Sequence, residues 1–121
     1  GNDLLIGGSG DTIQGGTGFD TVDWTDAGNV VLTGLSEVEN LDFSNGQVND
    51  ITITAADLTR LAPTGDTLYI GRDTAAGTTD TVNLTGATNM NAQTTFESVV
   101  YDHFQMADDV NKTINIYVQA A

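Results

Sequence analysis

The stretch that decides the fold is residues 1–24, which read GNDLLI, GGSGDTIQ, GGTGFDTVD and W. They divide into three blocks, and in each block an apolar residue follows an aspartate by two positions. The third block fits a nine-residue glycine-rich repeat throughout, the second lacks the residue before its aspartate, and the first begins within the repeat. The matching residues are Gly1, Asp3 and Leu5 in the first block, Gly7, Gly8, Gly10, Asp11 and Ile13 in the second, and Gly15, Gly16, Gly18, Asp20 and Val22 in the third.

Each part of this pattern has a physical role. Glycines allow positive φ angles, so the chain can turn tightly with its carbonyl groups pointing inward. The aspartate adds a carboxylate to those carbonyl oxygens, and such a shell of hard oxygen ligands is what Ca²⁺ prefers. The apolar residue two positions later begins a short strand whose side chain points into the core. The pattern therefore predicts turns that bind Ca²⁺ between short strands.

In these blocks the chain resembles the RTX family, whose repeats form a calcium-binding parallel β-roll. The resemblance implies that alternate turns stack on the same edge, which places Asp3 beside Asp20 and places Asp11 on the opposite edge near Asp26. An alternative is that glycine, asparagine and aspartate mark ordinary β-turns, although the regular apolar positions argue against it. The residues implied to ligate Ca²⁺, through carboxylates or backbone carbonyls, are Gly1, Asp3, Gly8, Gly10, Asp11, Gly16, Gly18, Asp20 and Asp26.

The composition points to a cation as the partner. The 121 residues suit one domain, and 17 acidic residues against 3 basic ones give a net charge of −14. Three scattered cations, Arg60, Arg72 and Lys112, exclude a basic patch for nucleic acid or an anionic membrane. We expect no membrane insertion, no disulfide because the chain has no cysteine, and a monomer when the module is isolated.

After Trp24 the repeat fades but short apolar alternations continue, and they predict strands. We expect an all-β fold: an RTX-type roll over 1–24, a wider irregular parallel β-solenoid over 25–95, and a C-terminal β-strand cap over 96–121. An antiparallel sandwich in 25–121, with Asn45-Gly46 as a hairpin turn, is the alternative. The alternating pairs are Val30 and Leu32, Leu41 and Phe43, Ile51 and Ile53, Leu68 and Ile70, and Val82 and Leu84.

One segment breaks the strand pattern. Thr54 is followed three positions later by Asp57, and alanines and leucines continue to Leu61 before Pro63. This is the signature of a short helix near 55–61 that is capped by Thr54. Such a short helix is marginal alone, so we expect Leu58 and Leu61 to pack against the strands.

The distal part resembles the C-terminal end of large RTX adhesins in three runs, Glu37–Asp42, Asp50–Leu58 and Asp80–Leu84. The polar tail that ends in a short hydrophobic strand, Thr113–Ala121, is similar to the uncleaved secretion signals of that family. The resemblance implies export by the type I secretion machinery of a Gram-negative bacterium and a secreted or cell-surface location. Because the chain begins without methionine in mid-repeat, we expect it to be the tail end of a longer protein.

No motif for a zinc protease, a nucleophile elbow, a P-loop or a cysteine nucleophile occurs, and the lone His103 follows Asp102 in a segment that also contains Tyr101 and Phe104. The sequence therefore predicts a non-enzymatic module: the calcium-binding end of a secreted RTX adhesin that folds on Ca²⁺ outside the cell. Two alternatives stay open. One is the carrier tail of a secreted protease, lipase or polysaccharide-modifying enzyme, and the other is a module that binds carbohydrate or ice through threonines.

Overall fold

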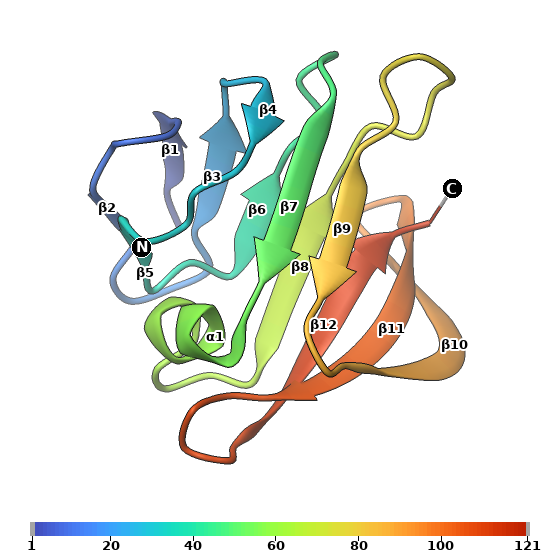
Figure 1. Ribbon diagram of the computed structural model, residues 1–121. Helices are drawn as coiled ribbons and strands as arrows, with labels where there is room; N and C mark the ends of the chain where they lie inside the picture. The colour runs from blue at the N-terminus through green and yellow to red at the C-terminus, as the bar shows by residue number, and fades with distance from the viewer. Residues whose placement is uncertain (1, 121) are drawn as a thin grey trace.

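The computed structural model describes residues 2–120, which are mostly β-strand with one short helix (Figure 1). Gly1, a predicted ligand, lies outside the described residues. The elements are β1 (Leu4–Gly7), β2 (Ile13–Gln14), β3 (Thr21–Trp24), β4 (Gly28–Asn29), β5 (Leu35–Ser36), β6 (Asn40–Asp42), β7 (Asn49–Ile53), α1 (Ala55–Leu61), β8 (Thr67–Gly71), β9 (Thr81–Leu84), β10 (Thr88–Phe96), β11 (Val99–Ala107) and β12 (Thr113–Gln119).

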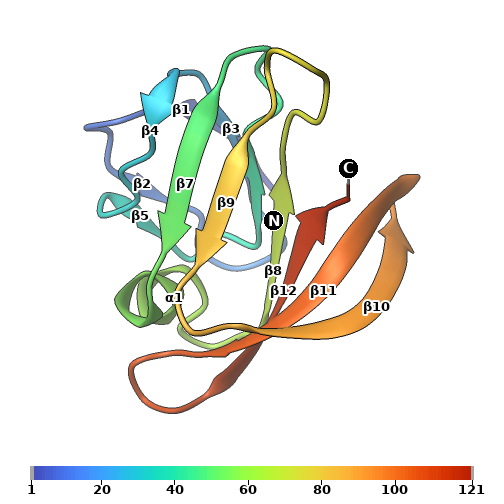
Figure 2. The ribbon, with the colours of Figure 1, turned by 45° about the vertical axis from the view of Figure 1, so that its right-hand side comes forward.

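The strands form one large sheet and two small ones. The large sheet has the order β1-β3-β6-β8-β12-β11-β10, and the small sheets are β2-β5 and β4-β7-β9. Pairing is parallel from β1 to β12 and within both small sheets, and it is antiparallel between β12, β11 and β10. The chain repeatedly crosses from the large sheet to a small one and back, which gives two layers (Figure 2).

The alternative hairpin at Asn45-Gly46 is wrong. This turn connects β6 to β7, and these two strands belong to different sheets. The connection is therefore a passage between layers and not a two-residue hairpin. The hydrophobic alternation alone could not distinguish the two, because a buried strand looks the same in either pairing.

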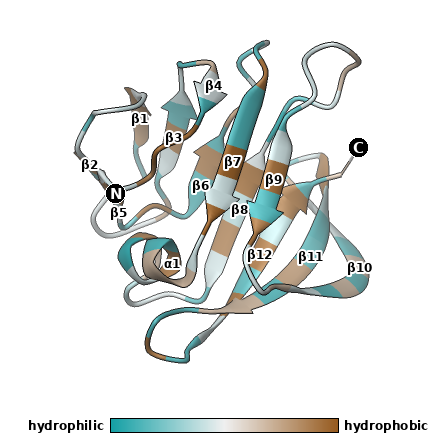
Figure 3. Cartoon of the chain, in the orientation of Figure 1, coloured by the Kyte–Doolittle hydropathy of each residue, from teal (hydrophilic) through white to brown (hydrophobic). Residues whose placement is uncertain are grey.

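The core lies between the layers. One column of paired residues crosses five strands of the large sheet. Figure 3 shows hydrophobic segments on strands of both layers. Register errors of one residue would expose this whole column. Trp24 and Phe43 pack beside it with ring centroids 5.7 Å apart. The column consists of Leu5, Val22, Leu41, Ile70 and Val118.

The predicted helix is confirmed as α1. The Thr54 side chain accepts the amide of Asp57, and the Asp57 carboxylate accepts the amide of Thr54, so the capping box is complete. Leu58 and Leu61 are fully buried. At the other end, the carbonyls of Arg60 and Leu61 accept the amides of Glu37 and Val38, each at 3.0 Å. The helix therefore holds the turn between β5 and β6 in place.

The C-terminal strands curl around the end of the large sheet. The expected final strand is confirmed as β12, which pairs with both β8 and β11. The tip of the β10–β11 hairpin returns over the outer face, where Phe96 stacks on Tyr69 at 4.4 Å between ring centroids and lies 5.5 Å from Phe19. His103 stacks on Tyr117, with Nε2 2.9 Å from Asn115 Oδ1.

Truncating the central column should test this core directly. Leu41→Ala removes a side chain that is 1% exposed, and we expect it to lower the free energy of unfolding by about 2 to 5 kcal/mol. Leu4→Ala is the control, because Leu4 is 66% exposed on the edge strand, and it should cost less than about 0.5 kcal/mol. Urea unfolding at one fixed Ca²⁺ concentration measures both. Equal losses would contradict the assigned register.

Candidate calcium-binding turns

The turn between β2 and β3 carries the buried carboxylate of Asp20, which is 0% exposed. Its Oδ1 accepts the amide of Asp3 at 2.8 Å, and the Asp20 amide donates to Glu39 Oε2 at 2.8 Å. These three residues precede β1, β3 and β6, which pair in register. The side chains of Asp20 and Glu39 thus each accept a backbone amide from the neighbouring turn. The predicted proximity of Asp3 and Asp20 is confirmed.

The second carboxylate oxygen of Asp20 has no hydrogen-bond partner among residues 2–120. Oδ2 is buried and accepts no hydrogen bond within the described part of the chain. Such an oxygen is costly to bury unless it meets a donor or a cation. A Cβ placed on Gly15 would lie 2.8 Å from this oxygen and would also collide with the Glu37 carbonyl. Glycine at this position therefore lets two turns approach closely around the carboxylate.

A cavity of about 420 Å³ lies beside this turn. Its walls include Gly16 and Gly18, which have φ angles of 88° and 110°, together with Glu37 and Glu39. Burial raises the pKa of Glu39 above 4.5, and the nearby carboxylates of Asp20 and Glu37 raise it further, while hydrogen bonds from backbone amides oppose the shift. The cavity thus combines glycine-rich backbone with two glutamates that the repeat pattern did not identify.

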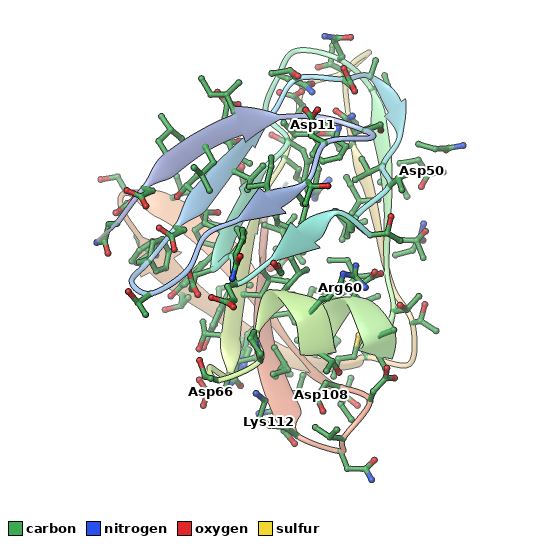
Figure 4. All side chains as sticks on the ribbon, turned by 90° about the vertical axis from the view of Figure 1, so that its left-hand side faces the viewer. Asp11, Asp50, Arg60, Asp66, Asp108 and Lys112 are labelled. Carbon is green, nitrogen blue, oxygen red and sulfur yellow. The ribbon has the colours of Figure 1, made fainter. Side chains whose placement is uncertain are left out.

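The opposite edge brings Asp11 and Asp26 together. Asp11 Oδ2 accepts the amide of Gly8 at 2.9 Å, and Asp26 Oδ2 accepts the amide of Ser9 at 2.8 Å. Both carboxylates are exposed, and Figure 4 shows Asp11 at a turn. Gly10 also has a positive φ of 88°. The predicted pairing of these residues on one edge is therefore confirmed as geometry, while ligation by them stays a prediction.

The side chain of Asp3 does not join Asp20 in a shared calcium shell, contrary to what the sequence had predicted. Only its backbone amide meets Asp20, whereas Asp3 itself is exposed and lines a separate hollow on the outer face with Asp42 and Glu97. The physical reason is the strand register, because Asp3 comes directly before the edge strand β1 and has no preceding turn beside it among the described residues.

Within residues 2–120, no three side chains of histidine, cysteine, aspartate or glutamate gather in the way that typical metal centres require. A calcium shell that is built mainly from backbone carbonyls needs fewer carboxylates. The turn with Asp20 fits such a shell better than the opposite edge does, because it contains a buried oxygen without a partner among these residues.

No described helix is long and apolar enough to cross a membrane.

Comparison with known proteins identifies no relative: no family model, no curated protein and no solved structure matches this chain.

Gly15→Ala should test the close approach of the turns around Asp20. The added methyl group must displace backbone, so we expect a loss of about 1 to 3 kcal/mol in the free energy of unfolding. Gly65→Ala is the matched control, because a Cβ there meets nothing within 4 Å. Thermal unfolding in saturating Ca²⁺ compares the two variants. A Gly15 variant that is as stable as the Gly65 variant would show that the turns are farther apart than described.

Proposed function

We propose that the chain is a non-enzymatic calcium-binding module in which an RTX-type β-roll runs into a wider parallel β-solenoid. In this proposal it forms the C-terminal end of a secreted bacterial adhesin and carries the signal for type I secretion. The observation that supports calcium binding most strongly is the Asp20 carboxylate, which is fully buried and has one oxygen without a hydrogen-bond partner in the described part of the chain.

The electrostatics of this turn favour a cation. Burying a carboxylate without a counter-charge is costly, and a bound cation offsets that cost. Glu37 and Glu39 add negative charge beside it. The C-terminal end of α1 also lies at this cavity, because Ala62 lines it together with Glu37 and Glu39, and helix C-termini favour positive charge. A divalent cation would offset all three contributions.

Asp20 and Glu39 would supply carboxylate oxygens, and the backbone around Gly16 and Gly18 would supply carbonyl oxygens. Bound Ca²⁺ would neutralise these carboxylates and tie neighbouring turns together. Glycine-rich backbone loses much conformational entropy on folding, and only a few apolar side chains from residues 2–24 are buried. Ca²⁺ binding would therefore contribute a large part of the stability of this region.

Extracellular calcium modules bind with dissociation constants of about 10⁻⁴ to 10⁻³ M. A site of this class is empty in a calcium-poor cytosol and filled outside the cell. The repeats would then stay loose during export and fold on emergence, when bound ligand adds RT ln(1 + [L]/Kd) to the stability. This behaviour suits a module that passes through a secretion channel before it folds.

Asp20→Asn tests the proposed site. The amide side chain keeps the volume and can still accept the amide of Asp3, but it removes the negative charge from the buried position. We expect calcium affinity to fall about tenfold or more, since a charged ligand is lost. Isothermal titration calorimetry with Ca²⁺ measures this effect.

Asp50→Asn is the control for this titration, because Asp50 is exposed on β7 and its Oδ1 accepts the side chain of Asn83. It should leave calcium affinity unchanged. If both variants bind Ca²⁺ like the unmodified chain, Asp20 is not a ligand. If neither the variants nor the unmodified chain binds Ca²⁺ at millimolar concentration, the proposed function is wrong.

The raised pKa of Glu39 predicts how calcium binding depends on pH. In the cation-free folded state the pKa of Glu39 lies above its ordinary value of 4.5. Glu39 therefore keeps its proton to a higher pH than an ordinary glutamate, and Ca²⁺ must displace that proton. Calcium affinity should therefore fall as the pH is lowered from 7 through the raised pKa, before ordinary carboxylates titrate. Glu39→Gln should bind more weakly at pH 7 and show a flatter pH dependence. If calcium affinity depends on pH in the same way in Glu39→Gln and in the unmodified chain, Glu39 is not a ligand.

A further inference from the structure

The two layers of the fold end at different places. The three-stranded sheet stops at β9, whereas the large sheet continues beyond β8 through β12, β11 and β10. Figures 1 and 2 show β10 and β11 curving away from β9 at this end. The inner face of the last strands is therefore only partly covered, and among the described residues β9 has no neighbouring strand on the side away from β7.

The free edge of β9 offers backbone hydrogen-bonding groups. Its other edge pairs with β7, and the amide of Thr85 extends that ladder to the Ile53 carbonyl at 3.1 Å. Because successive residues of a strand point their backbone groups to opposite edges, Val82 faces the free side. Its amide and carbonyl have no partner in residues 2–120, whereas Arg72 Nη1 donates to the preceding free-side carbonyl, that of Asp80, at 3.0 Å.

A groove of about 440 Å³ runs beside this edge and is called the β9 groove below. Val82 and Leu84 form one wall, and Phe104 with Val118 forms the floor. Val82, Leu84 and Phe104 are only partly buried although they contact the core. The Leu84 carbonyl on this edge accepts the amide of Ala87 at 3.4 Å, so within residues 2–120 the groups left without partners are those of Val82 and the amide of Leu84. The groove thus places an apolar floor next to backbone groups with which an added β-strand pairs.

The charged side chains that line the β9 groove differ in how many hydrogen-bond partners they have. Asp80 is 1% exposed, and its carboxylate accepts the amides of Asn49 and Asp73, each at 2.7 Å. Arg72 is engaged by the carbonyls of Gln119 and Asp80. The carboxylate of Asp102 has only one bond among the described residues, to the side chain of Gln93 at 2.8 Å.

A cation is therefore the complementary group at Asp102. The net charge of −14 also disfavours a second copy of this chain in the groove and attracts a basic partner.

We propose that the β9 groove binds an extended segment of a basic partner protein, which adds to β9 as a further strand. Asp102 and Phe104 lie two positions apart on β11 and share its inner face. The segment therefore presents an apolar side chain to Phe104 and a lysine or arginine, two positions away, to Asp102. The residues that line the groove all lie between 72 and 118, so the proposal stands independently of the calcium site.

Two blocked, fluorescently labelled seven-residue peptides test this surface. Each consists of threonine except for a valine and a lysine two positions apart, in either order, so that both strand directions are sampled. The complete 121-residue chain in millimolar Ca²⁺ should bind one of them in a fluorescence anisotropy titration. Replacing the lysine with glutamate, or methylating the backbone nitrogens that face β9, should abolish binding.

Asp102→Asn should lower the affinity for the lysine peptide about two- to fivefold, as expected for one partly exposed ion pair. Asp109→Asn is the matched control, because Asp109 is exposed in the β11–β12 loop, and it should bind like the unmodified chain. The proposal is overturned if the methylated or glutamate peptide binds equally well, if the two variants behave alike, or if neither lysine peptide binds at millimolar concentration. Self-association through the β9 amides would instead identify a second copy as the occupant.

Discussion

The structure depends on carboxylates that accept backbone amides from neighbouring turns. Where parallel strands end, the ladder hydrogen bonds end too, and the amides of the turns need other acceptors. Asp20 accepts the amide of Asp3, and Glu39 accepts the amide of Asp20. On the opposite edge Asp26 accepts the amide of Ser9. The acidity of the chain is therefore partly structural, because short acidic side chains continue the ladder around the corners, and this concentrates negative charge at both edges.

The three cations do not neutralise that charge. Arg60 donates to the carbonyls of Leu32 and Leu35, besides its ion pair with Asp57 at 2.7 Å. Arg72 joins the end of β12 to the start of β9, and Lys112 donates to the carbonyls of Ala62 and Pro63. Figure 4 places Arg60 at α1 and Lys112 below it, away from the turn of Asp11. Each cation thus joins segments of backbone, and the acidic edges are left to solvent and dissolved ions. This division of roles is the physical basis for proposing a bound divalent cation.

Local patterns predicted much of the fold. The capping residues defined α1, and apolar alternation located β7, β8, β9 and β12, because both signals act over a few residues. Val30 and Leu32 were expected in a strand, but β4 ends at Asn29, since the Leu32 carbonyl accepts the amide of Leu35 in a turn. Glu37 and Glu39 were not predicted as part of the site, because they lie outside the glycine repeat. They reach it through the pairing of β5 with β2 and of β6 with β3. The orientation of Asp3 and the β9 groove likewise follow from where sheets end, which a local pattern does not encode.

Amide hydrogen exchange of residues 2–24, measured in chelator and in millimolar Ca²⁺, tests the central claim most directly. The account predicts rapid exchange of these amides in chelator and strong protection in Ca²⁺, much less so in Mg²⁺, because the smaller ion demands stricter geometry. The apolar region from Val38 to Val118 should keep partial protection in both conditions, since its core is closed by side chains that are fully buried. Equally slow exchange of residues 2–24 with and without Ca²⁺ would contradict the account, because the turns would then be stable without a cation.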